Sequence, residues 1–145
     1  NGTSYTDIGR TFSNIIRRYP ISGGYVEVNG PGQPVFELLH SQEKKLKPYV
    51  TTNESKAQGI RTLIYDIQEQ KLELPSKELF PHLYTELNAF TYKINATGTI
   101  SFSAPNGLKD DCVMSLMLAN EARTKLAFST SKLYIGNKNK QQIYQ

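Results

Sequence analysis

The sequence has little sulfur and little histidine, and both scarcities limit the kinds of site it can build. Its single cysteine, Cys112, excludes an internal disulfide and any zinc cage made of cysteines. Its two histidines, His40 and His82, leave little for a histidine-rich metal site. A metal ion bound to this chain would therefore be held by carboxylates, which favours Mg²⁺ or Mn²⁺ over Zn²⁺.

Long hydrophobic runs are absent too. No apolar stretch approaches the roughly 20 residues that a helix needs to span a bilayer, and the first residues carry no signal-peptide pattern. We therefore expect no membrane partner and a cytoplasmic location. The 145 residues are 38% apolar and include nine tyrosines and six phenylalanines, enough for a globular domain with a core. Because the composition does not shift along the chain, we expect a single domain over residues 1–145.

The sequence carries a surplus of positive charge, with a formal net charge of +4 and an isoelectric point near 9.1. Basic residues cluster at 17–18, 44–47 and 132–140. This balance is compatible with a polyanionic partner such as a nucleic acid, but solvated surface lysines would give the same pattern.

The spacing of apolar residues predicts helices and strands in alternation. Helices are expected over 6–19, from 32 to about 40, from 51 to about 70, and over 78–90. Strands are expected over 25–28 and 46–50, with an antiparallel hairpin formed by 90–94 and 100–104. Thr6 would cap the first helix, and Thr51 with Glu54 has the spacing of a capping box. This order of elements is typical of an α/β domain.

Glu27 lies within the expected strand 25–28, among apolar neighbours. A carboxylate in the middle of a buried strand is costly unless it is paired, protonated or bound to a metal ion. Glu27 is therefore a candidate metal ligand, although a structural ion pair or an exposed edge position would also explain it.

Asp110 and Asp111 stand where the last apolar helical pattern begins, ahead of Val113 and Met117. Acids at a helix N-terminus are common partners of the helix dipole. Two adjacent carboxylates are also stabilised by a divalent cation lying between them and another acid. Together with Glu27, the pair describes half of a two-metal phosphodiesterase site, in which cations about 4 Å apart activate water and stabilise the leaving oxygen.

Four segments resemble, in order and spacing, the nuclease domain of the large terminase subunit of tailed bacteriophages. They are 24–32 (GYVEVNGPG), 54–57 (ESKA), 83–90 (LYTELNAF) and 107–116 (GLKDDCVMSL). The first is similar to the family's strand-Glu-x-Asn-x-x-Gly motif, and the last to its Gly-x-His-Asp-Asp signature. The resemblance extends over roughly residues 5–122.

This resemblance implies an α/β fold of the RNase H-like type, with a mixed sheet flanked by helices. It implies an endonuclease that cuts double-stranded DNA during viral genome packaging, with Mg²⁺ or Mn²⁺ and a two-metal hydrolysis. The partners it implies are a terminase ATPase domain, the small terminase subunit and the portal, in the cytoplasm of the host cell.

The resemblance also assigns residues. Glu27 would be the second acid of the metal site, and Asp110 or Asp111 the third, with Asp111 preferred and the choice left open because neighbours on a helix point about 100° apart. Lys56 and Lys109 are the expected DNA-binding residues, although Lys56 would equally suit a helix surface. Lys109 stands where the family commonly has histidine, so any role of that histidine is missing or altered.

A second departure concerns the family's first acid, which lies on a strand ahead of the first helix. Asp7 is not that acid, because it belongs to a helix start. We therefore expect the chain to be the C-terminal part of a terminase-type nuclease domain, without its first strands, and inactive or nearly so alone. No phosphate-binding loop of an ATPase is present. The alternatives are another RNase H-like nuclease, such as a junction resolvase or integrase, and a non-catalytic DNA-binding or assembly module.

Overall fold

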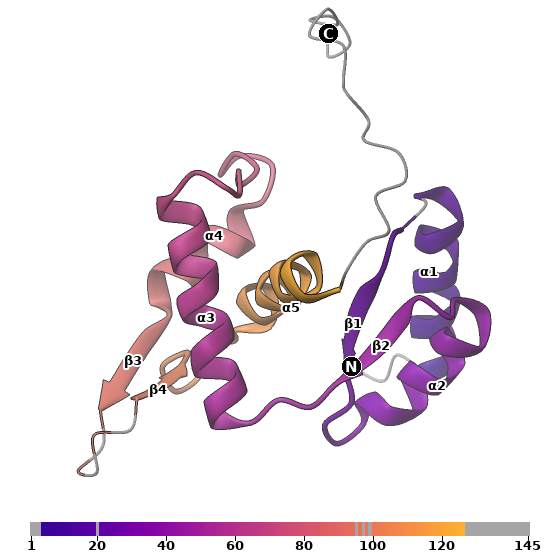
Figure 1. Cartoon of the computed structure of the whole chain (residues 1–145), viewed down its shortest axis with the longest axis horizontal. Helices are drawn as coiled ribbons and strands as arrows, with labels where there is room; N and C mark the ends of the chain where they lie inside the picture. The colour runs from indigo at the N-terminus through magenta and orange to yellow at the C-terminus, as the bar shows by residue number, and fades with distance from the viewer. Residues whose placement is uncertain (1–3, 20, 95, 97, 99, 127–145) are drawn as a thin grey trace, which may run out of the picture.

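A computed structural model describes residues 4–19, 21–94, 96, 98 and 100–126. The elements in chain order are α1 (Tyr5–Arg18), β1 (Gly24–Glu27), α2 (Gly32–Gln42), β2 (Leu46–Tyr49), α3 (Asn53–Gln68), α4 (Pro81–Ala89), β3 (Thr91–Ile94), β4 (Ile100–Ser103) and α5 (Asp111–Lys125) (Figure 1). The mixed α/β class expected from the sequence is confirmed. None of the described helices is long and apolar enough to cross a membrane.

The strands form two separate pairs. β1 and β2 are parallel, with Gly24 opposite Leu46 and Glu27 opposite Tyr49. A parallel pair needs a crossover, which α2 supplies, and α2 packs on both strands. β3 and β4 form the predicted antiparallel hairpin. Figure 1 shows α1 and α2 on one side of the parallel pair and α5, which packs against β1, on the other.

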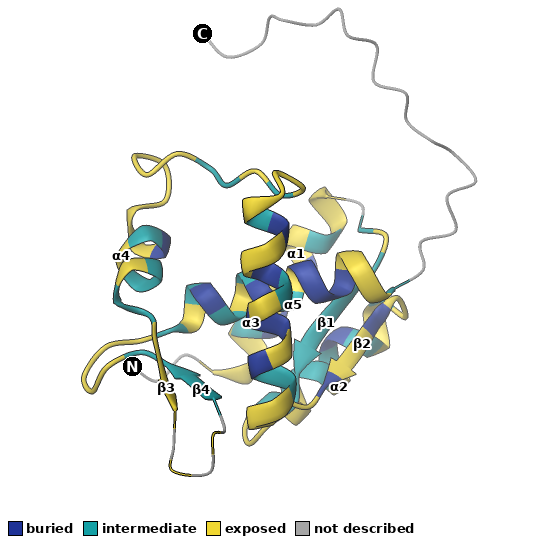
Figure 2. Ribbon diagram, turned by 60° about the vertical axis from the view of Figure 1, so that its left-hand side comes forward, coloured by how far each residue is buried: buried dark blue, intermediate teal, exposed yellow. Residues whose placement is uncertain are grey.

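The core lies where α3, α5 and the end of β2 meet (dark blue in Figure 2). Its buried members are Tyr49, Ile60, Leu63, Val113 and Met117. α3 and α5 approach closely at Gly59, where a Cβ atom would lie 2.7 Å from the Met117 sulfur. The core therefore joins α5, which carries the acid pair, to the helix that carries Lys56.

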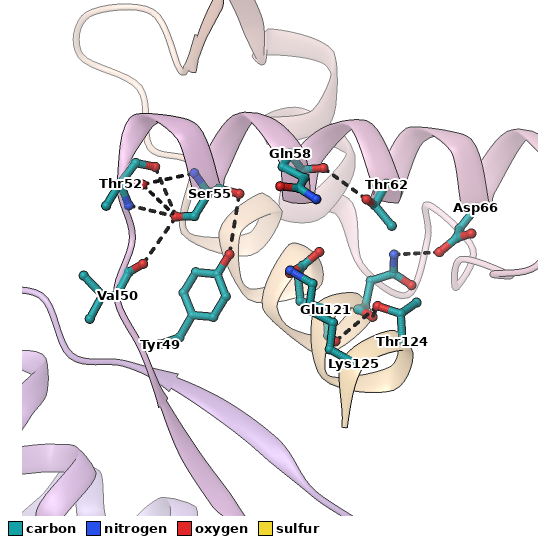
Figure 3. A network of polar contacts seen from close by, with 11 residues as sticks. Tyr49, Val50, Thr52, Ser55, Gln58, Thr62, Asp66, Glu121, Thr124 and Lys125 are labelled. Carbon is teal, nitrogen blue, oxygen red and sulfur yellow. Dashed lines mark hydrogen bonds and ion pairs between the residues drawn. The ribbon is translucent and has the colours of Figure 1, made fainter. Parts of the chain in front are cut away.

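Two predicted helix caps are wrong by one or two residues. α1 is capped by the Ser4 hydroxyl, which accepts from the Asp7 amide at 3.1 Å, and not by Thr6. The capping box of α3 consists of Thr52 and Ser55, one residue after the predicted Thr51 (Figure 3). Thr51 and Thr52 offer the same hydroxyl, and the Ser55 hydroxyl accepts from the N-cap amide as the Glu54 carboxylate would in the other register, so sequence spacing alone could not separate the two.

Two predicted helices also differ from the structure. α4 begins at Pro81 and not at residue 78, because proline suits the first helical position, where no partner for an amide is needed. The apolar stripe of α1 is present, but Phe12, Ile15 and Tyr19 are about half exposed. The residues that α1 buries are the small Gly9 and Ser13, on the face that packs against α2.

Candidate metal centre

Glu27 is the last residue of β1, at the carboxyl end of the parallel pair. The expectation that it lies in the middle of a buried strand is wrong, since β1 ends there and all four of its residues are half-buried. The chain then turns back under it: a Cβ atom at Gly32 would lie 2.1 Å from the Glu27 carbonyl oxygen, so glycine is needed at that position. The carboxylate is thus placed where two strands end, with part of its surface open to solvent.

The loop that follows Glu27 is fixed by Asn29, a residue that the sequence placed in a motif without giving it a role. Its side-chain amide donates to the Thr51 carbonyl at 2.8 Å, and its side-chain oxygen accepts from the Thr51 amide at 2.7 Å. The Val28 amide also donates to the Tyr49 carbonyl at 2.9 Å. These contacts tie together the segments that leave β1 and β2. The sequence feature that could have indicated this role is the position of Asn29, two residues after Glu27.

Asp110 and Asp111 lie at the start of α5, as predicted, but they point differently. Asp110 is the N-cap residue, and one of its carboxylate oxygens is 2.7 Å from the Lys56 ammonium. Asp111 is the first helical residue, its side chain is 78% exposed, and its nearest cation is Lys109 at 4.0 Å. Adjacent positions on a helix differ by about 100°, so one carboxylate faces the protein and the other faces solvent.

The amides at the start of α5 are capped from another helix. A carboxylate oxygen of Glu86, in α4, accepts from the amides of Cys112 at 2.6 Å and Val113 at 3.2 Å. Burial raises the pKa of the Cys112 thiol, and the nearby Glu86 carboxylate raises it further. Sequence reasoning missed this role of Glu86, because the acid comes from a helix that precedes the hairpin.

One cleft connects Glu27 to the acid-bearing helix. It has a volume of about 660 Å³, a mainly apolar lining, and both Glu27 and Ser115 on its wall. The Ser115 hydroxyl donates to the Asp111 carbonyl at 2.8 Å. The cleft therefore extends from the end of β1 along α5 from Ser115 onward, and Asp111 lies one turn before it.

Solved structures of phage proteins share this arrangement of elements. The large terminase nuclease of thermophilic phage G20c is 26% identical over 82% of this chain, with a TM-score of 0.68. The same nuclease with bound magnesium is 26% identical over 83%, with a TM-score of 0.67. The chain resembles the large terminase nuclease domain. No protein-family model matches the sequence, and no curated protein does.

This chain matches only part of the length of the solved large terminase nucleases. This chain spans 62% of the G20c nuclease, and 63% of the cobalt-bound form of that nuclease, to which it is 27% identical with a TM-score of 0.65. The RNase H-like α/β fold predicted from the four motifs agrees with these structures. The neighbours that hold cobalt and magnesium associate this fold with divalent metal ions.

The acids of this terminase-like chain have the oxygen ligands that a hard divalent cation requires. Within the described ranges, however, no group of three or more acidic, histidine or cysteine side chains lies close enough to hold a metal ion. Glu27 lines the cleft, whereas Asp111 lies one turn before Ser115, the first residue of α5 that lines it, so these acids do not form a complete site. Lys109 is 82% exposed and Lys56 is largely buried against Asp110, and contact of either with DNA stays a prediction.

Proposed function

We propose that this chain is part of a metal-dependent endonuclease that cuts double-stranded DNA during viral genome packaging. The observation that carries the proposal is one cleft lined by Glu27 at a strand end and by Ser115, one turn after Asp111 on the helix that the acid pair opens, in a fold shared with large terminase nucleases. The whole chain would belong to one nuclease domain, joined in the host cytoplasm to an ATPase domain and working with a small subunit and a portal.

Glu27 and Asp111 are the side chains proposed to hold Mg²⁺ or Mn²⁺. Asp111 suits this role because it is exposed, whereas the Asp110 oxygen nearest the protein already accepts from Lys56. A bound pair of such ions would supply the activation of water and the stabilisation of the leaving oxygen. Since the chain spans about 62% of the solved nuclease, we expect a further ligand from a part of such a domain that this chain does not include.

Lys109 is proposed to contact the DNA backbone. Its side chain is 82% exposed and it directly precedes the acid pair, so it could pair with a phosphate near the scissile bond. Contacts of this kind position the duplex and carry no sequence information. Cutting specificity would therefore depend on how the packaging complex holds the DNA.

Metal titration tests the proposal. Calorimetry with Mn²⁺ should show binding to the wild-type chain that is lost in Glu27→Gln and in Asp111→Asn. Glu54→Gln removes an exposed acid near the start of α3 and serves as the matched control, with binding unchanged. Binding that persists in both site variants, or no binding to the wild type, would contradict the nuclease site.

A second function is favoured by one specific observation, namely that each aspartate of the pair has a lysine as its nearest cation. A carboxylate that is neutralised by lysine does not need a metal ion. In this reading the chain is a non-catalytic DNA-binding or assembly module. The absence of Mn²⁺ binding together with retained DNA binding would support it.

A further inference from the structure

Asp110 occupies the N-cap position of α5 but does not cap the helix. An aspartate at this position ordinarily accepts from the second or third amide of its own helix. The Asp110 side chain makes no such bond. Instead its carboxylate accepts from the Lys56 ammonium at 2.7 Å, across the interface between α3 and α5.

Glu86 performs the capping in its place. The second and third amides of α5 are those of Cys112 and Val113, and both donate to a single Glu86 oxygen. An anion at this position also complements the positive end of the helix dipole. Because these amides are already satisfied, the Asp110 carboxylate is free to turn away from its own helix.

Lys56 then fixes the direction in which Asp110 turns. Its side chain is 18% exposed, and its ammonium lies 5.6 Å from the centre of the Phe90 ring as well as against Asp110. Lys56 belongs to the first turn of α3, which the capping box of Thr52 and Ser55 holds in place. The lysine is therefore anchored on a rigid element and does not reach freely into solvent.

We propose that Glu86 and Lys56 are positioning residues for the acid pair. Glu86 takes over the helix cap that Asp110 would otherwise form, and Lys56 holds the carboxylate that is released. Asp110 is thereby kept beside α3 while Asp111 points outward. The importance of this arrangement rests on the proposed function, in which the pair serves a metal site, but the contacts themselves can be tested without metal or DNA.

Two measurements on the intact chain read the two contacts separately. Hydrogen exchange of the Cys112 and Val113 amides reports the cap, and the rate of Lys56 acetylation, followed by mass spectrometry, reports the contact with Asp110. In Asp110→Ala, acetylation of Lys56 should rise by about tenfold, the factor that corresponds to loss of one charge-assisted hydrogen bond. Exchange of the two amides should stay at the wild-type rate, because Glu86 still caps them.

Glu86→Ala should give the complementary result. The vacated amides attract the Asp110 carboxylate, so Lys56 loses its partner and its acetylation again rises by about tenfold. Glu86→Gln keeps an acceptor oxygen and should restore most of the wild-type behaviour. Glu54→Gln removes a charge two residues from Lys56 and should change neither measurement.

The proposal is overturned if Asp110→Ala exposes the two amides to exchange, since Asp110 would then be the cap. It is also overturned if Glu86→Ala leaves Lys56 as protected as before. Should Glu86→Ala fail to fold, Asp110→Ala decides the question alone. Either failure leaves the Mn²⁺ titration of Glu27 and Asp111 unaffected, so the positioning proposal and the nuclease proposal fail separately.

Discussion

The most buried charge in the described part of the chain is Glu121, which is 1% exposed (Figure 3). It lies on α5 beside Gly59 of α3 and forms an ion pair with Lys125, one turn later. Neither of its oxygens has another hydrogen-bond partner among the described residues. Since a buried carboxylate is costly without compensation, Lys125 is its main support.

We therefore expect Lys125→Met to destabilise the fold. The lysine side chain is 49% exposed, so the unfolding free energy should fall by about 1–3 kcal/mol, less than for a fully buried pair. Urea denaturation at neutral pH measures it. The double variant Glu121→Met with Lys125→Met should recover most of the loss, because no charge is then left unpaired. Equal stability of Lys125→Met and the wild type would contradict this account.

The same pair predicts a dependence on alkaline pH. The hydrogen bond with the Glu121 carboxylate raises the pKa of Lys125 above its ordinary value. A raised pKa in the folded state means that the pair stabilises the fold fully below the ordinary lysine pKa of about 10.4 and stops doing so as pH rises through the folded value. The stability difference between the wild type and Lys125→Met should be constant from neutral pH to about pH 10 and shrink above it.

Asn29 is the residue whose contacts most directly support Glu27. Asn29→Ala removes both hydrogen bonds to the Thr51 backbone, and since they are solvent-exposed we expect a loss of about 1 kcal/mol in unfolding free energy. Asn29→Asp keeps the acceptor and loses the donor, so it should lower the unfolding free energy by less than Asn29→Ala does. Chemical denaturation of the three proteins checks the order. An unchanged midpoint for Asn29→Ala would contradict the role given to this loop.

At the scale of elements, α3 and α5 cross closely at Gly59. Gly59→Ala should raise helix propensity by up to about 1 kcal/mol, yet the new methyl would lie 2.7 Å from the sulfur and 2.9 Å from the Cγ of Met117. Met117 is fully buried and cannot move without disturbing the core. Overpacking of this kind costs about 1–3 kcal/mol, so we expect a net loss of stability.

Thermal unfolding of Gly59→Ala tests this packing. Gln58→Ala, on the exposed face of the same helix, is the matched control and should be close to neutral. Adding Met117→Val to Gly59→Ala should recover part of the loss by making room at the crossing. A more stable Gly59→Ala variant would show that propensity outweighs the contact.

The elements also show what the sequence could and could not predict. Local patterns predicted the hairpin and a helix opening at Asp110, because alternation and acidic helix starts depend on neighbouring residues. They could not predict that Glu86 would cap α5 or that Lys56 would reach Asp110, because these contacts join segments distant in the chain. The prediction that the apolar stripe of α1 would be buried was wrong for the same reason, because the elements packed around a helix decide which of its faces is buried.

For the whole molecule, the proposed nuclease site requires Glu27 and the start of α5 to come together. β1 and α5 are far apart in sequence, and the packing of α5 against β1 places both beside one cleft. The sequence motifs indicated which acids are candidate metal ligands, namely Glu27, Asp110 and Asp111. The approach of α5 to β1 could come only from the fold, and the core around Met117 maintains it by joining α5 to α3 and β2.

The molecule as a whole is basic, so its affinity for duplex DNA should depend on salt. The net charge of +4 and the exposed Lys109 predict weak binding without sequence preference, with a dissociation constant of about 10⁻⁴ to 10⁻⁶ M at physiological salt. Lys109→Glu should weaken binding to every sequence and reduce the salt slope by about 1 for each phosphate that the side chain no longer neutralises. Fluorescence anisotropy over a range of salt concentrations measures both.

Lys71→Glu is the control for that measurement. Lys71 is exposed and lies just beyond the end of α3, whereas Lys56, which contacts Asp110, lies at the start of the same helix. Both substitutions lower the net charge equally, so a general attraction would make the two variants equally weak. We expect Lys109→Glu to lose clearly more affinity, because its charge directly precedes the proposed metal ligands. Equal losses would mean that DNA is attracted by total charge and does not contact the chain at the start of α5.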